Sequence, residues 1–277
     1  MRHATFLIGD RVRWGRIDGN TLVPLDGLFP TLKAAIAAGA LSNRDLAQVA
    51  GPALALADVK LLPVLPDPVK ILCVGLNYEN HRRETGRAQV GHPTIFTRFA
   101  DSQIGHGAFI TRPRESTHLD YEGELAIVIG TGGRRIPAAS AIEHIAGYSC
   151  YNDASIRDWQ AHTIQFTPGK NFPGTGAFGP WLVTPDEFGV PGPQRLQTRL
   201  NGEVMQEATL GHMIFPIEVI VEYCSTFTYL SPGDVILTGT PGGVGAKRNP
   251  QVFMKPGDRV EVEIDGIGIL ENRVVEE

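Results

Sequence analysis

Three acidic residues flank two apolar segments of this 277-residue chain. Glu122 and Glu124 lie two residues apart, and the branched apolar run that follows at residues 125–129 predicts a strand. Side chains two apart on a strand point to the same face, so we expect the two carboxylates to share one face. Asp153 ends a second apolar and aromatic segment, which begins at Gly147. A third carboxylate can therefore lie beside the first two.

Such a trio would suit a hard divalent cation. Carboxylate oxygens are the ligands that Mg²⁺ and Mn²⁺ prefer. Taken alone, Glu122 and Glu124 are more often a solvated face of a strand, and an aspartate such as Asp153 is more often a turn residue or helix cap. The metal hypothesis therefore depends on what else the chain carries.

His81 and Glu84 form a second group with possible chemistry. They lie three residues apart in the polar stretch 75–86, which we interpret as a helical turn or lid, so they would share one face. A carboxylate partner fixes the tautomer of an imidazole and supports its protonated form. The imidazole could then take a proton from water. The alternative is an incidental pair on a surface helix.

Positive charges and a glycine-rich loop offer sites for anions. Lys170 could give a point charge to an oxyanion or a proton to a carbanion, or it could be a solvated loop lysine. Residues 238–245 follow an apolar strand, and their backbone N–H groups could line an anion pocket, or the segment could be a tight turn. Arg157 and Arg98 could each bind a second substrate carboxylate. Arg157 could instead pair with Asp158 or another acid.

Composition excludes several classes of protein. The net charge of -5 argues against nucleic acid or an anionic membrane as the main partner. Apolar runs stay short of the ~20 residues of a membrane span, and the apolar N-terminal stretch breaks too early for a signal peptide. We expect Cys73, Cys150 and Cys224 to be reduced and buried, in a cytoplasmic protein.

The chain divides into two blocks. Residues 1–66 predict a small N-terminal domain, a cap or dimerisation unit, and three prolines at 63, 66 and 68 indicate a linker. A larger domain follows at 69–277. Within the two blocks the patterns predict strands at 5–8, 12–17, 69–74, 125–129, 235–237, 259–264 and 267–275, and helices at 31–40, 43–50 and 214–229.

The order of motifs resembles the fumarylacetoacetate hydrolase superfamily, from about Lys70 to the C-terminus. The resemblance is carried by Val74-Gly75-Leu76-Asn77-Tyr78 with His81 and Glu84, by Tyr121-Glu122-Gly123-Glu124-Leu125, by the segment from Gly147 to Asp153 with Arg157, Asp158 and Gln160, by Gly169-Lys170-Asn171-Phe172, and by the segment from Gly233 to Gly245. One departure is at Arg98-Phe99, where many relatives have Lys-Pro. The resemblance therefore leaves the substrate open.

The resemblance implies a fold and a set of roles. The fold would be α+β and β-rich, a mixed β-roll behind a small N-terminal α/β cap domain, usually in a homodimer. The roles it implies, together with the interpretation above, are Mg²⁺ or Mn²⁺ ligands at Glu122, Glu124 and Asp153, a catalytic group of His81, Glu84 and Lys170, and substrate binding by Arg157, Gln160, Thr240 and Arg98.

The expected reaction is metal-dependent hydrolysis of a C–C bond in an acylpyruvate-like 2,4-dioxo acid, for example fumarylpyruvate. An isomerase, tautomerase or decarboxylase could use the same residues to form an enolate from a 2-oxo acid without attack by water. A metal-dependent binding protein without turnover is a third alternative, against which the His81–Glu84 pair argues.

Overall fold

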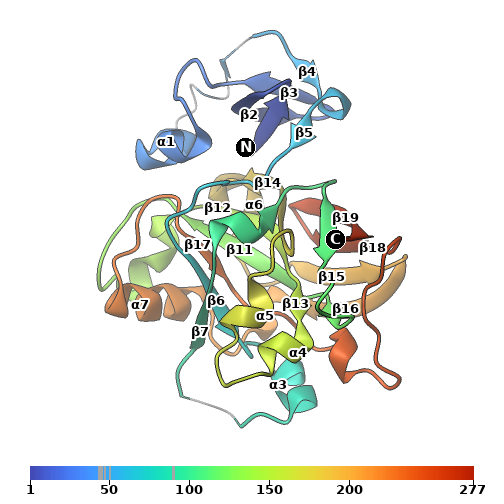
Figure 1. Ribbon diagram of the computed structural model, residues 1–277. Helices are drawn as coiled ribbons and strands as arrows, with labels where there is room; N and C mark the ends of the chain where they lie inside the picture. The colour runs from blue at the N-terminus through green and yellow to red at the C-terminus, as the bar shows by residue number, and fades with distance from the viewer. Residues whose placement is uncertain (43–45, 47, 50, 89–90) are drawn as a thin grey trace.

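The computed structural model describes residues 1–42, 46, 48–49, 51–88 and 91–277 (Figure 1). Its strands are β1 (Arg2–Ile8), β2 (Arg11–Asp18), β3 (Thr21–Pro24), β4 (Leu54–Ala55), β5 (Lys60–Leu61), β6 (Ile71–Gly75), β7 (Thr94–Arg98), β8 (Gln103–Ile104), β9 (Phe109–Arg112), β10 (Leu119–Asp120), β11 (Gly123–Ile129), β12 (Ile145–Asp153), β13 (Ser155–Ile156), β14 (Gly176–Val183), β15 (Arg195–Leu200), β16 (Glu203–Thr209), β17 (Val235–Leu237), β18 (Arg259–Ile264) and β19 (Gly268–Glu276).

Its α-helices are α1 (Leu32–Ala37), α3 (Glu79–Thr85), α4 (Arg157–Gln160), α5 (Thr167–Lys170), α6 (Pro185–Phe188) and α7 (Ile217–Phe227). Among the described residues no helix is both long and apolar enough to cross a membrane. The helix predicted at 43–50 lies outside the described residues apart from 46, 48 and 49, and it stays a prediction.

The described residues form three sheets, and these confirm the predicted β-rich α+β class. The largest has the order β4-β3-β2-β1-β14-β12-β11-β17-β6-β7, with β5 on β1 and β8 on β14. A second sheet has the order β16-β15-β18-β19-β9, and β10 pairs with β13. The strands of the N-terminal block stand together at the top of Figure 1, yet β1 is hydrogen-bonded to β14, so they continue the central sheet.

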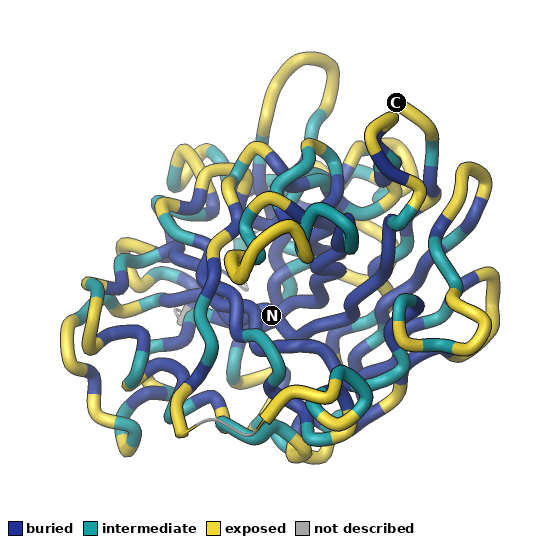
Figure 2. Tube along the Cα trace, turned by 60° about the horizontal axis from the view of Figure 1, so that its bottom comes forward, coloured by how far each residue is buried: buried dark blue, intermediate teal, exposed yellow. Residues whose placement is uncertain are grey.

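Strand β11 is buried on both faces, which explains its apolar run. Leu125 and Ile127 pack in one core cluster with side chains of α7 and of the five-stranded sheet. Ala126 and Val128 point the other way, into a cluster with Trp14 and the apolar face of α1. Figure 2 shows such buried strands inside a shell of exposed loops. Side chains at the end of β11 are therefore held by a rigid support.

Helix α7 follows the periodicity that predicted it. It begins after Pro216, and it buries Ile217, Ile220, Val221 and Cys224 at the spacing of one helical face. Cys73 and Cys150 are also buried, and all three cysteines are free thiols. Burial of Cys224 raises the pKa of its thiol to about 12, so it stays protonated at neutral pH.

Candidate active site and metal centre

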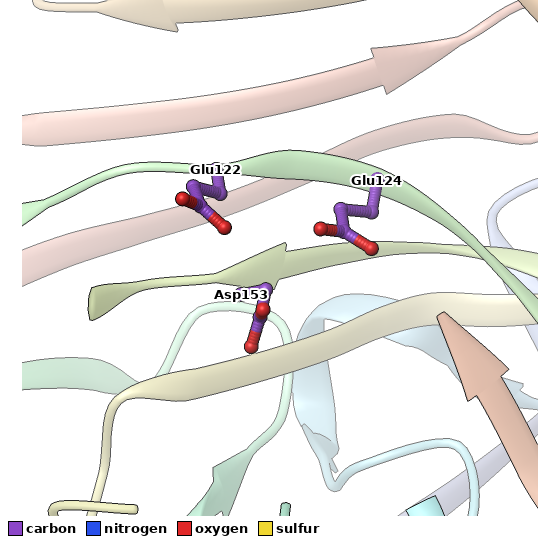
Figure 3. A group of neighbouring side chains, drawn as sticks. All are labelled: Glu122, Glu124 and Asp153. Atoms are coloured by element: carbon purple, nitrogen blue, oxygen red, sulfur yellow. The ribbon is translucent and has the colours of Figure 1, made fainter. Parts of the chain in front are cut away.

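The three predicted carboxylates converge at one end of the central sheet. Strands β11 and β12 are antiparallel, and their register sets Glu124 opposite Tyr151. The backbone N–H of Asp153 donates to the carbonyl oxygen of Glu122 over 2.8 Å, so these two residues are also neighbours. One ligand oxygen from each of the three acids lies within 4.8 Å of the others, and all three residues are buried (Figure 3).

Lys170 is a cation that contacts two of these three carboxylates. Its Nζ donates to Glu122 Oε2 over 2.6 Å and to Asp153 Oδ2 over 2.5 Å, from the end of the short helix α5. Burial tends to raise the pKa of Glu122, but the charges of Lys170 and Arg157 outweigh it and lower that pKa to about 2. Two of the three carboxylates thus share one ammonium group.

Glu124 forms no ion pair with any of the residues that the structure describes. Its Oε2 accepts a hydrogen bond from the backbone N–H of Gly239 over 2.8 Å. Burial raises the pKa of Glu124 well above its ordinary value, and the charges of Asp153 and Glu122 raise it further. Additional positive charge at this centre would therefore stabilise the ionised form of Glu124. Glu122, Glu124 and Asp153 form a donor set that would fit a divalent ion. The ammonium group of Lys170 shows that a positive charge is stabilised beside these carboxylates.

His81 and Glu84 stand over the same centre on α3. His81 Nδ1 lies 2.7 Å from Glu84 Oε1, and Glu84 Oε2 accepts from the backbone N–H of Gly243 over 2.8 Å. An imidazole that donates Nδ1–H to a carboxylate keeps its lone pair on Nε2. Helix α3 ends at Gly86, whose φ of 69° is the left-handed conformation that favours glycine.

The glycine-rich loop after β17 forms another side of this site. Thr240 is buried, donates its hydroxyl to the carbonyl of Gly123 over 2.9 Å and accepts from Gln206 Nε2 over 2.8 Å. The hydroxyl proton of Thr240 is therefore already donated to an acceptor of the protein. The backbone N–H groups of Gly239 and Gly243 donate to the side chains of Glu124 and Glu84. These two groups are therefore not free to line the predicted anion pocket.

The side chain of Arg157 lies in this site, where it pairs with acidic residues, as the second of its two predicted roles requires. Its Nε donates to Asp120 over 2.8 Å, and its Nη1 contacts Glu122 at 2.6 Å and Gln160 Oε1 at 2.9 Å. The acid partners are Asp120 and Glu122, not Asp158. Its Nη2 is buried and has no hydrogen-bond partner within the described residues, so one donor is left for a bound molecule.

Arg98 lies elsewhere, and its prediction as a substrate-binding residue is corrected. Its side chain is fully buried behind the centre, where it contacts Asp153 Oδ1, the carbonyl of Ala154 and the hydroxyl of Thr175. All of these partners are protein groups, so Arg98 positions a carboxylate. Arg98 ends β7, at the edge of the large sheet and separated from β12 by β11, β17 and β6, so its contact with Asp153 could not be known from the sequence pattern around it.

Two residues of the site have no counterpart in the prediction. Asp120 is fully buried and accepts from Arg157 and from the backbone N–H groups of Gly245 and Ala246. Its place beside the acidic motif was a signal, though its backbone partners Gly245 and Ala246 lie over a hundred residues away. Gln206 joins the backbone of Gly123 to Thr240, and no sequence feature marked it.

One cavity of about 320 Å³ joins these groups. Its charged and polar walls include His81, Glu122, Glu124, Arg157, Gln160, Lys170 and Thr240. Asp153 lies behind this wall. The remaining wall is largely apolar and includes Val74, Leu76, Phe96, Phe166 and Val244. Leu76 has a φ of 60°, a conformation rare for leucine, at the turn from β6 toward α3.

Comparison with known families confirms the expected resemblance. Residues 70–275 match the family described as fumarylacetoacetate (FAA) hydrolase, C-terminal. Residues 1–63 match a family described as Rv2993c-like, N-terminal. The motifs that carried the resemblance all lie in the first of these two ranges.

Individual relatives carry names of more than one activity. The chain is 42% identical over 226 residues to a mitochondrial oxaloacetate tautomerase, FAHD2A of Bos taurus, covering 81% of this chain and 72% of the relative. A fumarylacetoacetate hydrolase structure from Exiguobacterium antarcticum is 36% identical, with a TM-score of 0.88 over all of both chains. A maleylpyruvate hydrolase structure from Sphingobium sp. SYK-6, in complex with manganese(II) and pyruvate, is 25% identical, with a TM-score of 0.84 over 100% of this chain and 99% of the other.

Proposed function

We propose a reaction from the premise that this chain belongs to the fumarylacetoacetate hydrolase family: it catalyses the metal-dependent enolisation of a 2-oxo acid, completed as keto–enol tautomerisation of an oxaloacetate-like acid. The observation that carries the proposal is that His81, which pairs with Glu84, lines one cavity together with Glu122 and Glu124 of the buried acidic centre. A base next to a cation site is what removal of a proton beside a ketone requires.

The proposed ligands are Glu122, Glu124 and Asp153, for Mg²⁺ or Mn²⁺. When bound, such an ion supplies Lewis-acid stabilisation of the charge that develops on a keto oxygen. Carboxylate ligands from three residues leave coordination positions for a substrate. Both ions accept such ligands, so the choice between them is left to experiment.

The protein's own groups would move the proton. His81 Nε2 takes it from the carbon beside the ketone, and Glu84 supports the imidazolium that forms. The protonated His81 then gives the proton to the enolate oxygen, so the enol forms and the reaction needs no co-reactant. Arg157 Nη2 is the unpaired donor that can hold the acid group next to the ketone. Lys170, close to the carboxylates, adds positive charge on the same side.

Hydrolysis of an acylpyruvate is the second candidate, and the same His–Glu pair favours it. There His81 would take a proton from water, which adds to the distal carbonyl before the C–C bond breaks. The two reactions share the deprotonating residue and differ in whether water enters. The 42% identity to a relative named as a tautomerase supports tautomerisation as the first candidate.

Purified protein with Mg²⁺ or Mn²⁺ tests the proposal by the rate of oxaloacetate enol–keto interconversion, followed by ultraviolet absorbance with an EDTA control. Proton NMR of the products separates a tautomer from pyruvate after decarboxylation, and a panel of acylpyruvates tests hydrolysis. We expect tautomerisation. Absence of acceleration for every acid, with Mn²⁺ binding demonstrated, would overturn the proposal.

The matched variant is His81→Ala. A positioned base contributes about 10²–10⁴-fold in rate, so the variant should lose that factor while it keeps its affinity for Mn²⁺. His212→Ala is the control, because His212 is exposed and lies outside the cavity wall. An unchanged rate in His81→Ala would exclude His81 as the base, whereas Mn²⁺ binding with no acceleration in the unaltered protein would favour a metal-dependent binding protein without turnover.

A further inference from the structure

We propose that Arg87 and Lys247, at the mouth of the cavity, bind the far carboxylate of a 2-oxo dicarboxylic acid. The inference rests on the proposed function, which places the 2-oxo end of the acid at the buried centre. It adds a second point of recognition at the opposite end of the cavity. By residue type, Arg98 and Arg157 were the expected ligands of a second substrate carboxylate, but both side chains are paired with acids of the protein.

The positive charges along the cavity differ in what compensates them. Lys170 and Arg157 are inner residues, and both are paired with Glu122. Arg87 and Lys247 also line the cavity but are exposed, and neither side chain has an ion pair or hydrogen bond within the described part of the chain. The described acids of the cavity wall are all at the inner end, so two positive charges at the mouth are uncompensated.

Apolar side chains also line the cavity. Phe96, Phe166 and Val244 are among them, and Phe96 and Phe166 meet edge to face with ring centroids 5.7 Å apart. The cavity therefore combines a buried acidic metal centre, apolar side chains and exposed cations. A 2-oxo dicarboxylate offers the complementary groups: a chelating 2-oxo acid, a hydrocarbon linker and a carboxylate. A 2-oxo acid with an apolar tail would leave the two cations without a partner.

The two cations come from the segments that carry the chemistry. Arg87 follows Gly86, which ends the helix that bears His81. Lys247 ends the short turn Gly245–Lys247, and Asp120 holds that turn while it also binds Arg157. A carboxylate that contacts both cations would join the end of α3 to the glycine-rich loop. Arginine can offer two N–H donors to one carboxylate, and lysine adds a point charge.

Local positive charge also matters for approach to the site. The chain has a net charge of -5, which repels a dianion at long range. Two unpaired cations at the entrance reverse that sign where the substrate enters. Because both are exposed, their contribution should weaken as salt rises. The preference for a dicarboxylate should therefore be larger in dilute buffer than in concentrated NaCl.

A matched pair of acids tests this by equilibrium binding. 2-Oxoglutarate and 2-oxopentanoate have the same chain length and differ in a terminal carboxylate against a methyl group. Isothermal titration calorimetry of the Mn²⁺-loaded protein should give a dissociation constant for 2-oxoglutarate about tenfold below that for 2-oxopentanoate. The double variant Arg87→Ala/Lys247→Ala should bring the ratio close to one and leave 2-oxopentanoate binding unchanged.

Arg83→Ala is the control, because Arg83 is an exposed arginine on the same helix, paired with Glu79 and absent from the cavity wall. It should keep the tenfold ratio. Equal binding of the two acids by the unaltered protein, or an undiminished ratio in the double variant, would overturn the inference and leave the proposed function standing. Failure of both acids to bind would overturn the proposed function together with it.

Discussion

Two buried sites in this protein treat ionisable groups in opposite ways. At the acidic centre, Glu122 and Asp153 share the ammonium of Lys170 at 2.6 and 2.5 Å. At the junction of β1 with β14, the imidazole of His3 is equally buried, yet neither ring nitrogen has a hydrogen-bond partner within the described residues. One site keeps its charges by pairing them, and the other excludes charge.

The pKa values record this difference. Burial lowers the pKa of His3 to about 3, helped by the positive charges of the N-terminal amine and Arg16. His3 is therefore neutral in the folded protein. At the acidic centre burial also opposes charge, but Lys170 and Arg157 reverse its effect on the pKa of Glu122. Burial alone therefore does not decide whether a group is ionised, because the neighbouring charges do.

Removal of Lys170 should be the most damaging change. Lys170→Met removes the ammonium group that two buried carboxylates share and leaves Glu122 paired with Arg157 alone and Asp153 with Arg98 alone, so the free energy of unfolding of the metal-free protein should fall by about 3–5 kcal/mol. Mn²⁺ should restore part of it, because a bound ion stabilises the folded state. Urea denaturation with EDTA and with Mn²⁺ measures both effects.

Lys255→Met is its control, since Lys255 forms its 2.9 Å ion pair with Asp258 from an exposed position and should lose little. Equal losses in the two variants would mean that burial at the acidic centre adds nothing to the pairing energy.

His3 should make the protein sensitive to acid. Its ordinary pKa is 6.5 and its folded pKa is about 3, so below 6.5 the unfolded chain binds a proton that the folded chain does not. Stability from this residue is therefore lost as pH falls, by about 2 kcal/mol at about pH 5. His3→Leu should show that much less loss between about pH 7.5 and 5 in denaturation experiments, whereas exposed His212→Leu should behave like the unaltered protein.

Glu124 should give the smallest change, in the opposite direction. Its pKa is raised in the folded state by burial and by Asp153 and Glu122, so it stabilises the fold below its ordinary value of 4.5 and loses that contribution as pH rises. Glu124→Gln should therefore raise the free energy of unfolding of the metal-free protein by about 1 kcal/mol near pH 8. Its affinity for Mn²⁺, measured by calorimetry, should fall. A less stable variant at that pH would contradict the assignment.

The sequence predicted local elements well where the pattern is strong. The strands expected at 235–237 and 259–264 are observed over those residues, because apolar runs and clean alternation specify a buried strand directly. The family resemblance and the β-rich fold class are confirmed. The division at residues 66–69 stays a prediction, as do the homodimer and the cytoplasmic location; the bovine relative is named as mitochondrial.

The sequence predicted which residues belong to the site better than it predicted the contacts between them. Residue type and spacing together with the family resemblance predicted the acids and the His–Glu pair. Arg98 was assigned to substrate, whereas it lies behind Asp153, and Asp120 and Gln206 were not considered. Each of these errors concerns a contact between residues far apart in the chain. Spacing within one segment says nothing about which other segment faces it.

By itself the sequence determined that Glu122 and Glu124 share a face, because side chains on a strand alternate with a period of two residues. Only the tertiary structure decided that Asp153 stands beside Glu122 and that Lys170 lies between them. The register of β11 on β12 fixes the first contact, and packing of α5 fixes the second. Both depend on burial across the whole core, which no local pattern contains.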